Sequence, residues 1–184
     1  MQTKVDLSNY DNSWYDPGSK IKCMIWYFIN ILILKNRWIP SSALRVYTLR
    51  LFGSKIGKQV VIKPGVNVKY PWKLSIGDYS WIGEAVWIDN LDQVIIGKNV
   101  CVSQGAMLLS GNHNYKKTTF NLMIAPITIE TGVWVGAKTI ICQGSTLKTH
   151  SVLTVGSIAN GILEAYGIYK GNPAIKIKER QLLL

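Results

Sequence analysis

The chain has 184 residues, of which 48% are hydrophobic and 17% are charged, a composition that excludes an intrinsically disordered chain and fits one domain with a short appendage. Lys and Arg number 21 against 10 Asp and Glu, and the net charge of +11 favours a polyanionic partner: nucleic acid, an anionic membrane or a phosphorylated ligand. Three separated cysteines indicate a reducing compartment rather than a disulfide framework, so we expect a cytoplasmic protein. Two histidines exclude a site that needs three from one chain.

The first 54 residues form an extension that precedes the periodic part of the chain. Residues 1–20 are polar, unlike the start of a signal peptide, and the apolar run Cys23–Leu34 follows between basic residues. As a helix this run rises about 18 Å, less than the roughly 30 Å hydrocarbon core, so we do not expect it to span a membrane. Either it packs on the protein or a neighbouring subunit, or it lies peripherally at the inner face of the membrane. Its apolar character on all sides favours packing.

Aliphatic residues recur every six positions between residues 55 and 170, often followed by glycine. Three sets begin 20 residues apart, at Ile56, Ile76 and Ile96, and a fourth begins at Ile129. A period of six fits neither an amphipathic helix nor an alternating strand, but it fits a short strand and a tight corner, repeated. One aliphatic side chain per hexad then points inward, and several coils must stack to bury a shared core.

The repeat has one long interruption, at about residues 110–126. Such an excursion covers no core of its own and is often functional. It contains His113, and an imidazole exchanges protons near neutral pH, as a general base must. The alternative is a surface histidine without a role. His150 lies within a regular coil, where a structural role is favoured.

These features resemble the hexapeptide-repeat O-acetyltransferases of the galactoside and maltose type. The matching segments are Gly111-Asn112-His113, Pro126-Ile127-Thr128-Ile129, Trp134-Val135-Gly136 and Gly171-Asn172-Pro173-Ala174, the last followed by basic residues. Residues 49–88, together with Asp6-Leu7-Ser8 and the apolar run, further resemble the colanic acid biosynthesis acetyltransferases, and this resemblance covers nearly the whole chain.

The resemblance implies a mainly β fold. It implies a left-handed parallel β-helix over residues 55–170 with a catalytic loop at 110–126, an N-terminal helical segment within residues 1–54 and a basic tail at 171–184. Members are usually homotrimers with active sites between neighbouring subunits. The implied activity is transfer of an acetyl group from acetyl-CoA, as co-substrate, to the hydroxyl of a sugar or lipid-linked oligosaccharide in exopolysaccharide or capsule assembly. No permanently bound cofactor and no metal are implied.

The resemblance also suggests roles for individual residues. His113 is the candidate general base, and the sugar hydroxyl would attack the thioester directly. A backbone N–H near Gly136-Ala137 would stabilise the oxyanion, and late basic residues would bind the CoA phosphates. The expected contacts to CoA are Trp134, Gly136, Ala137, Gly156, Lys170, Asn172, Pro173, Lys176 and Lys178. The expected contacts to the acceptor are Asp89, Asn90, Asn112 and Tyr115.

The sequence departs from the family pattern at two places, one next to the candidate base His113 and one in the expected CoA-binding segment. Asn114 stands where the colanic acid subfamily has Asp, so it lacks the charge that would help to orient His113. Asn160-Gly161 stands where galactoside-type relatives carry a Thr-Lys pair that contacts CoA.

Two other interpretations compete with this one. An acyl-cysteine intermediate on Cys142 is disfavoured because no histidine lies near it in sequence. A non-enzymatic β-helix module that binds carbohydrate or membrane is the alternative function. We expect no nucleic-acid partner, since no known binding motif is present.

Overall fold

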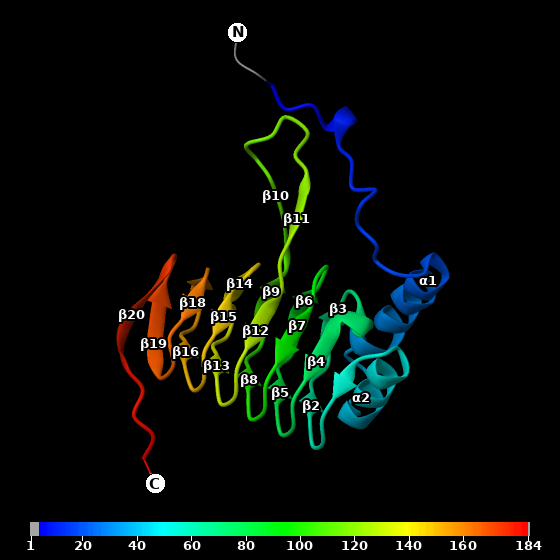
Figure 1. Cartoon of the computed structure of the whole chain (residues 1–184). Helices are drawn as coiled ribbons and strands as arrows, with labels where there is room; N and C mark the ends of the chain where they lie inside the picture. Colours follow the sequence, from blue (N-terminus) through cyan, green and yellow to red (C-terminus); the bar gives the residue numbers. More distant parts are fainter. Residues whose placement is uncertain (1–3, 184) are drawn as a thin grey trace.

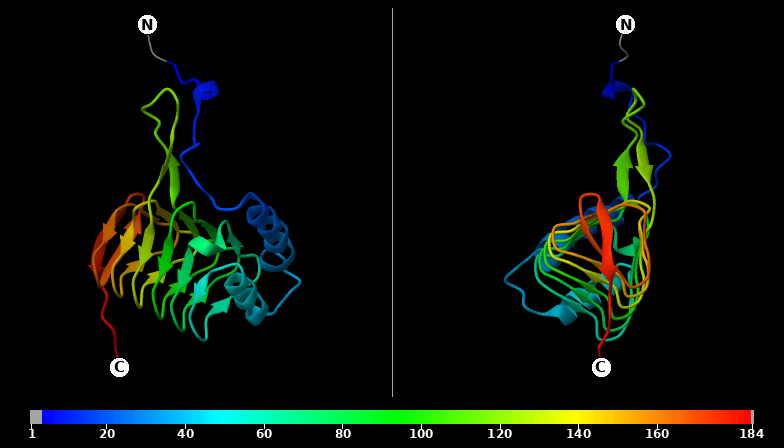
Figure 2. Two further views of the ribbon diagram at one scale, coloured as in Figure 1. Left: turned by 45° about the vertical axis from the view of Figure 1, so that its right-hand side comes forward. Right: turned by 90° about the vertical axis from the view of Figure 1, so that its left-hand side faces the viewer.

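The computed structural model describes residues 4–183, which form a stack of short coils with helices at one end and a hairpin projecting from the middle (Figure 1). Three parallel sheets make up the coils, and the view along the stack in Figure 2 shows them as the sides of a rough triangle. The expected parallel β-helix of hexapeptide repeats is confirmed.

Each complete coil contributes one strand to each sheet, so parallel neighbours in a sheet are one coil apart in sequence. The last strand of sheet 2 is the exception, since it turns back antiparallel on the strand before it. Sheet 1 contains β1 (Lys55–Ile56), β4 (Leu74–Ile76), β7 (Val94–Ile96), β12 (Ile127–Ile129), β15 (Thr146–Leu147) and β18 (Ile162–Leu163). Sheet 2 contains β2 (Val61–Ile62), β5 (Trp81–Ile82), β8 (Cys101–Val102), β13 (Trp134–Val135), β16 (Val152–Leu153), β19 (Gly167–Gly171) and β20 (Ala174–Glu179). Sheet 3 contains β3 (Asn67–Val68), β6 (Trp87–Asp89), β9 (Met107–Leu109), β14 (Ile140–Cys142) and β17 (Ile158–Ala159).

Two positions of the hexad point inward and form the core, rather than the one expected. They are the aliphatic residue of the repeat and the residue two before it, as in Val94 with Ile96 and Ser80 with Ile82, and these four are at most 2% exposed. In sheet 1 the strand register places Ile56, Ile76, Ile96 and Ile129 in one line, and each is at most 9% exposed. The glycine that follows is required by the close approach of the coils: a Cβ on Gly77 would lie 2.6 Å from the carbonyl carbon of the next coil. The Ile-Gly pairs of the sequence therefore mark where one coil rests on the next.

The apolar run Cys23–Leu34 is helical. It covers most of α1 (Lys20–Ile29) and all of the π-helical segment η2 (Asn30–Leu34), which continues α1. One face packs on the coils through Trp26, Asn30 and Leu34, each at most 8% exposed, and Trp26 Nε1 donates to the carbonyl of Val68 at 2.8 Å. No helix within residues 4–183 is both long and apolar enough to cross a membrane.

A second helix, which the sequence analysis did not anticipate, covers the first coil. This helix, α2 (Ser42–Leu51), is capped by Ser41, whose hydroxyl accepts from the Leu44 N–H at 3.2 Å, and it packs beside β2 (Figure 1). Short 3₁₀ turns occur at η1 (Leu7–Asn9) and η3 (Pro71–Lys73). At the other end of the stack, part of the expected basic tail forms β20, antiparallel to β19.

Candidate active site

A hairpin of two strands carries His113 away from the stack. Strands β10 (Gly111–His113) and β11 (Leu122–Ile124) pair antiparallel, with His113 opposite Leu122. The chain leaves sheet 3 after β9 and returns to sheet 1 at β12, so the hairpin projects from the corner between these sheets (Figure 1). The interruption in the hexad repeat is therefore an ordered arm with a histidine near its base.

The His113 ring is held on two sides. Its Nδ1 lies 3.0 Å from the carbonyl oxygen of Phe120, and its ring stacks on the Phe120 ring with centroids 4.5 Å apart and planes inclined by 8°. Tyr10, from the N-terminal segment, packs against it at 5.8 Å between centroids. Because a carbonyl only accepts, Nδ1 carries the hydrogen and the lone pair resides on Nε2. The ring is thus oriented with one basic nitrogen available.

The contact with Phe120 shows how His113 is oriented although Asn114 stands in place of the Asp of the colanic acid subfamily. The Asn114 side-chain oxygen accepts from the Lys116 N–H at 3.1 Å and shapes the turn of the hairpin. The carbonyl of Phe120 orients His113 instead, and Phe120 adopts a φ of 50°, a left-handed conformation that is uncommon outside glycine. A backbone acceptor leaves no signal in side-chain identity, so sequence reasoning missed it.

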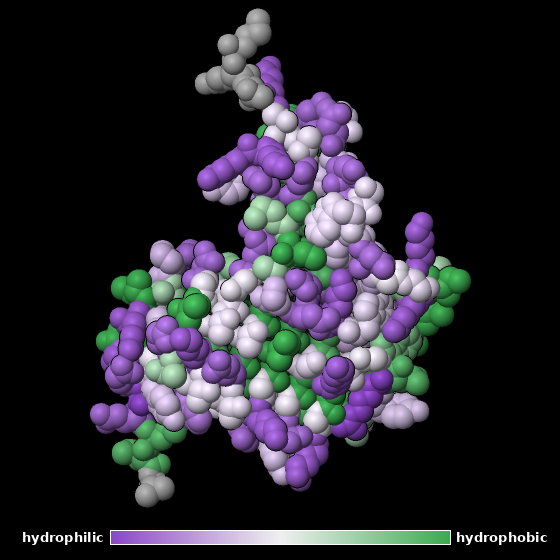
Figure 3. Space-filling view, in the orientation of Figure 1, coloured by the Kyte–Doolittle hydropathy of each residue, from purple (hydrophilic) through white to green (hydrophobic). Residues whose placement is uncertain are grey.

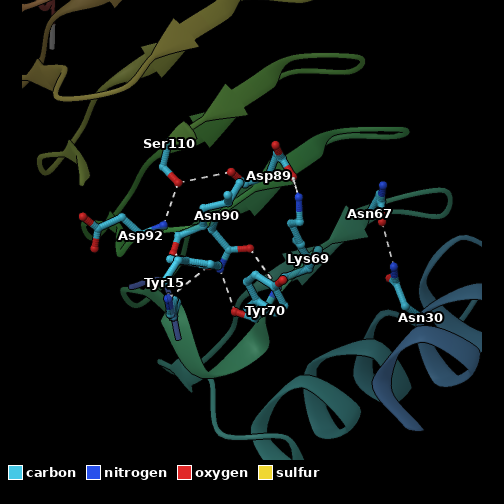
Figure 4. A network of polar contacts seen from close by, with 12 residues as sticks. Tyr15, Asn30, Asn67, Lys69, Tyr70, Asp89, Asn90, Asp92 and Ser110 are labelled. Carbon is cyan, nitrogen blue, oxygen red and sulfur yellow. Dashed lines mark hydrogen bonds and ion pairs between the residues drawn. The ribbon is translucent and has the colours of Figure 1, made fainter. Parts of the chain in front are cut away.

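A pocket of about 150 Å³ lies beside His113 at the base of the hairpin. Its walls are Lys69, Asp89, Leu91, Gly111, Asn112, His113 and Leu122. The Asp89 carboxylate pairs with the Lys69 ammonium at 3.0 Å (Figure 4). One chain therefore brings His113 together with two of the expected acceptor residues, Asp89 and Asn112, and adds a lysine that the sequence analysis did not single out.

The other two expected acceptor residues lie elsewhere. Asn90 is fully buried, accepts from the Tyr70 N–H at 3.0 Å and donates to the Tyr70 carbonyl at 2.7 Å (Figure 4). Its amide links two coils, so its geometry favours a structural role. Tyr115 is 74% exposed in the turn of the hairpin, outside the walls of the pocket.

The N-terminal segment is fastened beside the pocket. The Tyr15 hydroxyl donates to the carbonyl of Leu91 at 2.8 Å, and the Lys73 ammonium donates to the same oxygen at 2.7 Å. Burial raises the pKa of Tyr15 and lowers the pKa of Lys73. Further out, the Asp6 N–H donates to Thr118 of the hairpin at 2.9 Å. The segment thus bridges α1 and the hairpin and delivers Tyr10 to His113.

The expected oxyanion donors lie at a different corner. Gly136 and Ala137 connect β13 of sheet 2 to β14 of sheet 3, whereas the hairpin lies between sheets 3 and 1. The Gly136 N–H already donates to Leu153 at 2.8 Å, while the Ala137 N–H has no acceptor among the described residues. Trp134 is 49% exposed and its Nε1 donates to Ser103 Oγ at 3.0 Å. A single chain does not place this corner against His113.

The remaining candidate CoA residues lie near the C-terminal end of the stack. Lys170 and Lys178 are exposed on β19 and β20, and Asn172-Pro173 forms the turn between these strands. Lys176 pairs with Glu179 at 2.5 Å, so part of the expected positive charge is neutralised locally. Gly156, with a φ of 67°, lies at a corner where an added Cβ would meet no atom within 4 Å.

Cys142 lies at the end of β14 as a free, half-buried thiol. Burial raises the pKa of this thiol, which keeps it protonated near neutral pH. Since the thiolate is the nucleophilic form, the environment of Cys142 favours a structural cysteine over an acyl carrier.

Comparisons with known proteins agree with this fold. No protein-family model matches the chain. A curated Escherichia coli K12 relative that carries the name colanic acid biosynthesis acetyltransferase WcaF is 36% identical over 178 residues, which is 95% of this chain and 97% of the relative. The acetyl-CoA complex of the hexapeptide-repeat acetyltransferase VCA0836 from Vibrio cholerae superposes with a TM-score of 0.81 at 21% identity, over 90% of this chain and 92% of that one. A galactoside acetyltransferase in complex with coenzyme A superposes with a TM-score of 0.77 at 21% identity, over 88% and 82% of the two chains. The identity and extent of the first match show that the chain belongs to the family of colanic acid biosynthesis acetyltransferases.

Proposed function

We propose that the protein transfers an acetyl group from acetyl-CoA to a hydroxyl of a sugar or lipid-linked oligosaccharide during exopolysaccharide or capsule assembly. The observation that carries the proposal is the orientation of His113: Phe120 accepts from Nδ1 and leaves Nε2 as a base beside a polar pocket. The family membership supports the acetyl donor and the polysaccharide context.

The chemistry requires one proton to be moved twice. Nε2 of His113 removes the proton of the sugar hydroxyl as its oxygen attacks the thioester carbonyl carbon. The tetrahedral oxyanion collapses, the carbon–sulfur bond breaks, and the imidazolium returns the proton to the CoA thiolate. Asp89, paired with Lys69 at 3.0 Å, is suited to orient other hydroxyls of the acceptor in the same pocket.

A neighbouring copy of the chain would complete this site. The Ala137 N–H, at a different corner of the coil from His113, is the proposed oxyanion donor, and the projecting hairpin supports a contact across subunits. We therefore propose a homotrimer in which the hairpin of one subunit reaches the Gly136-Ala137 corner of the next. Lys170 and Lys178 are the exposed lysines proposed to bind CoA phosphates.

The helix α1 supports peripheral contact with a membrane. Only one face of α1 and η2 packs on the coils. The opposite face carries five large hydrophobic residues that are each between 57% and 67% exposed: Ile21, Met24, Tyr27 and Phe28 of α1 and Leu32 of η2. Figure 3 shows hydrophobic side chains at the right-hand edge, where α1 lies. Lysines flank the helix at both ends, and such a surface suits an interface with anionic lipid. We propose that it holds the protein at the inner face of the membrane, near a lipid-linked acceptor.

The decisive experiment compares two histidine variants for acetyl transfer to a panel of sugars and lipid-linked oligosaccharides. His113→Asn should lower kcat by about 10²–10⁴-fold, the usual contribution of a general base. His150→Asn is the matched control, because His150 has a φ of 58° that Asn tolerates and its ring stacks on Tyr166, away from the hairpin.

Circular dichroism and size-exclusion chromatography establish that both variants keep the fold. Equal turnover by wild type and His113→Asn would refute the mechanism. A wild-type protein that binds no acetyl-CoA in calorimetry would favour the non-enzymatic binding module.

A further inference from the structure

A second and larger groove lies next to the pocket at His113. Its volume is about 370 Å³, and it runs between α1 with η2 on one side and the outer face of β3 and β6 on the other. Lys69 and Asp89 line both cavities, so the two meet at this ion pair. An acceptor that occupies the His113 pocket can therefore extend past Lys69 and Asp89 into the groove beside α1.

Aromatic rings and paired amides line the groove. Trp87 points outward from β6 and is 41% exposed, and Tyr27 of α1 and Tyr70 also border the groove. Asn30 of η2 donates from Nδ2 to Asn67 Oδ1 of β3 at 2.7 Å (Figure 4). A flat ring beside fixed amide groups matches a sugar, which has an apolar face of C–H bonds and a rim of hydroxyls.

One amide atom in this wall has an unmet hydrogen-bonding requirement. Asn30 is only 8% exposed, and within residues 4–183 its Oδ1 is buried without a hydrogen-bond donor. A buried acceptor left unpaired is unfavourable, so the hydrogen bonding of the Asn30–Asn67 amide pair is incomplete as it stands. The Asn30–Asn67 pair gives the groove wall a polar group next to Trp87, which is the partner of Asn67 in the strand register.

We propose that this groove is a second acceptor subsite, which binds the sugar unit adjacent to the one that is acetylated. The inference rests on the proposed function and extends it: the acceptor is an oligosaccharide whose glycosidic linkage crosses the Lys69–Asp89 pair. A phosphate is a poorer occupant of the end of the groove that meets the His113 pocket, because Asp89 neutralises Lys69 and adds a carboxylate there. The other lysine of the groove, Lys35, is tested as a phosphate ligand by substitution. The subsite would make the enzyme discriminate between a single sugar and a chain.

Trp87 offers a sharp test because the same coil provides a matched control. Trp81 lies in β5, points outward from sheet 2 and is 59% exposed, so it is a tryptophan of the same kind on another side of the coil. The full-length wild type, Trp87→Ala, Trp87→Phe and Trp81→Ala are assayed with methyl glycosides and with disaccharides of the same sugars.

The measured quantity is the ratio of kcat/KM for the disaccharide to that for the monosaccharide. Trp87→Ala should lower this ratio at least tenfold through KM, Trp87→Phe should restore most of it, and Trp81→Ala should keep the wild-type ratio. An unchanged ratio in Trp87→Ala, or an equal loss in Trp81→Ala, would overturn the proposal.

Calorimetry of the disaccharide without acetyl-CoA separates this inference from the proposed function. Binding that Trp87→Ala weakens at least tenfold supports the subsite even if no acetyl transfer is detected. Displacement of the disaccharide by inorganic pyrophosphate, abolished in Lys35→Ala, would overturn the subsite in favour of a phosphate site, since Lys35 also lines the groove.

Discussion

Because of the stacked core, we expect truncation of two adjacent isoleucines, Ile96 and Ile95, to have very different effects on the free energy of unfolding. Ile96 is 2% exposed in β7 and lies between Ile76 and Ile129 of the neighbouring coils, whereas Ile95 points outward and is 44% exposed. Truncating Ile96 to Ala removes buried methyl groups and leaves a cavity between two strands whose spacing their backbone hydrogen bonds hold. We therefore expect Ile96→Ala to lower the free energy of unfolding by about 3–5 kcal/mol, the upper part of the range for such changes. Ile95→Ala opens no cavity and should cost about 1 kcal/mol or less.

Guanidinium unfolding followed by circular dichroism measures both values. The variants must be compared at one protein concentration, because oligomer formation adds a concentration-dependent contribution to stability. Equal losses at the two positions would refute the inward orientation of Ile96 and the outward orientation of Ile95. A loss at Ile95 that disappears on dilution would instead identify a contact between subunits.

Two further predictions concern the thiol and the glycines. Cys142→Ala should keep kcat within about twofold. In the wild type, burial raises the pKa of the Cys142 thiol and depletes the thiolate, so its alkylation by iodoacetamide should become fast only above the pH usual for a thiol. Mass spectrometry of the alkylated protein measures this rate. Gly77→Ala should lower the unfolding temperature more than Gly156→Ala, because the first places a Cβ 2.6 Å from the backbone of the next coil and the second has open space and only a strained φ of 67°; the reverse order would contradict the close-packing argument.

Much of the fold could be predicted because its information is local. The hexad period equals the length of one side of a coil, so Ile76 and Ile96 indicate the sheet, the inward face and the coil spacing without any long-range contact. The hairpin was visible for the same reason, since a long insertion in a strict repeat is conspicuous. The helix α2 could not be predicted in this way, because Ser42–Leu51 belongs to no repeat and its buried residues pack on β1 and β2, which are defined only in the folded chain.

The candidate site was only half readable from the sequence. His113 and Asp89 could be predicted because the residue type alone identifies an imidazole as a candidate base and a carboxylate as a candidate ligand for hydroxyls. The neighbour of Asp89, Asn90, looks equally suitable in sequence, yet the corner of the coil turns it inward to bond Tyr70. Phe120 acts through a backbone carbonyl, and Tyr10 reaches His113 from more than 100 residues away in the chain. These contacts depend on tertiary geometry, which no local pattern encodes.

The geometry of the coil places a condition on any site that uses both His113 and the Ala137 N–H. The chain visits the corner between sheets 2 and 3 at Ala137 and the corner between sheets 3 and 1 at the hairpin, and the packed interior separates these corners. No loop movement within one coil joins them without unstacking the core. A hairpin that extends away from its own stack can meet the other corner only on a second copy of the chain (Figure 2). The proposed homotrimer is thus tied to the proposed mechanism: if Ala137 supplies the oxyanion donor, a dissociated subunit should bind acetyl-CoA poorly and transfer no acetyl group.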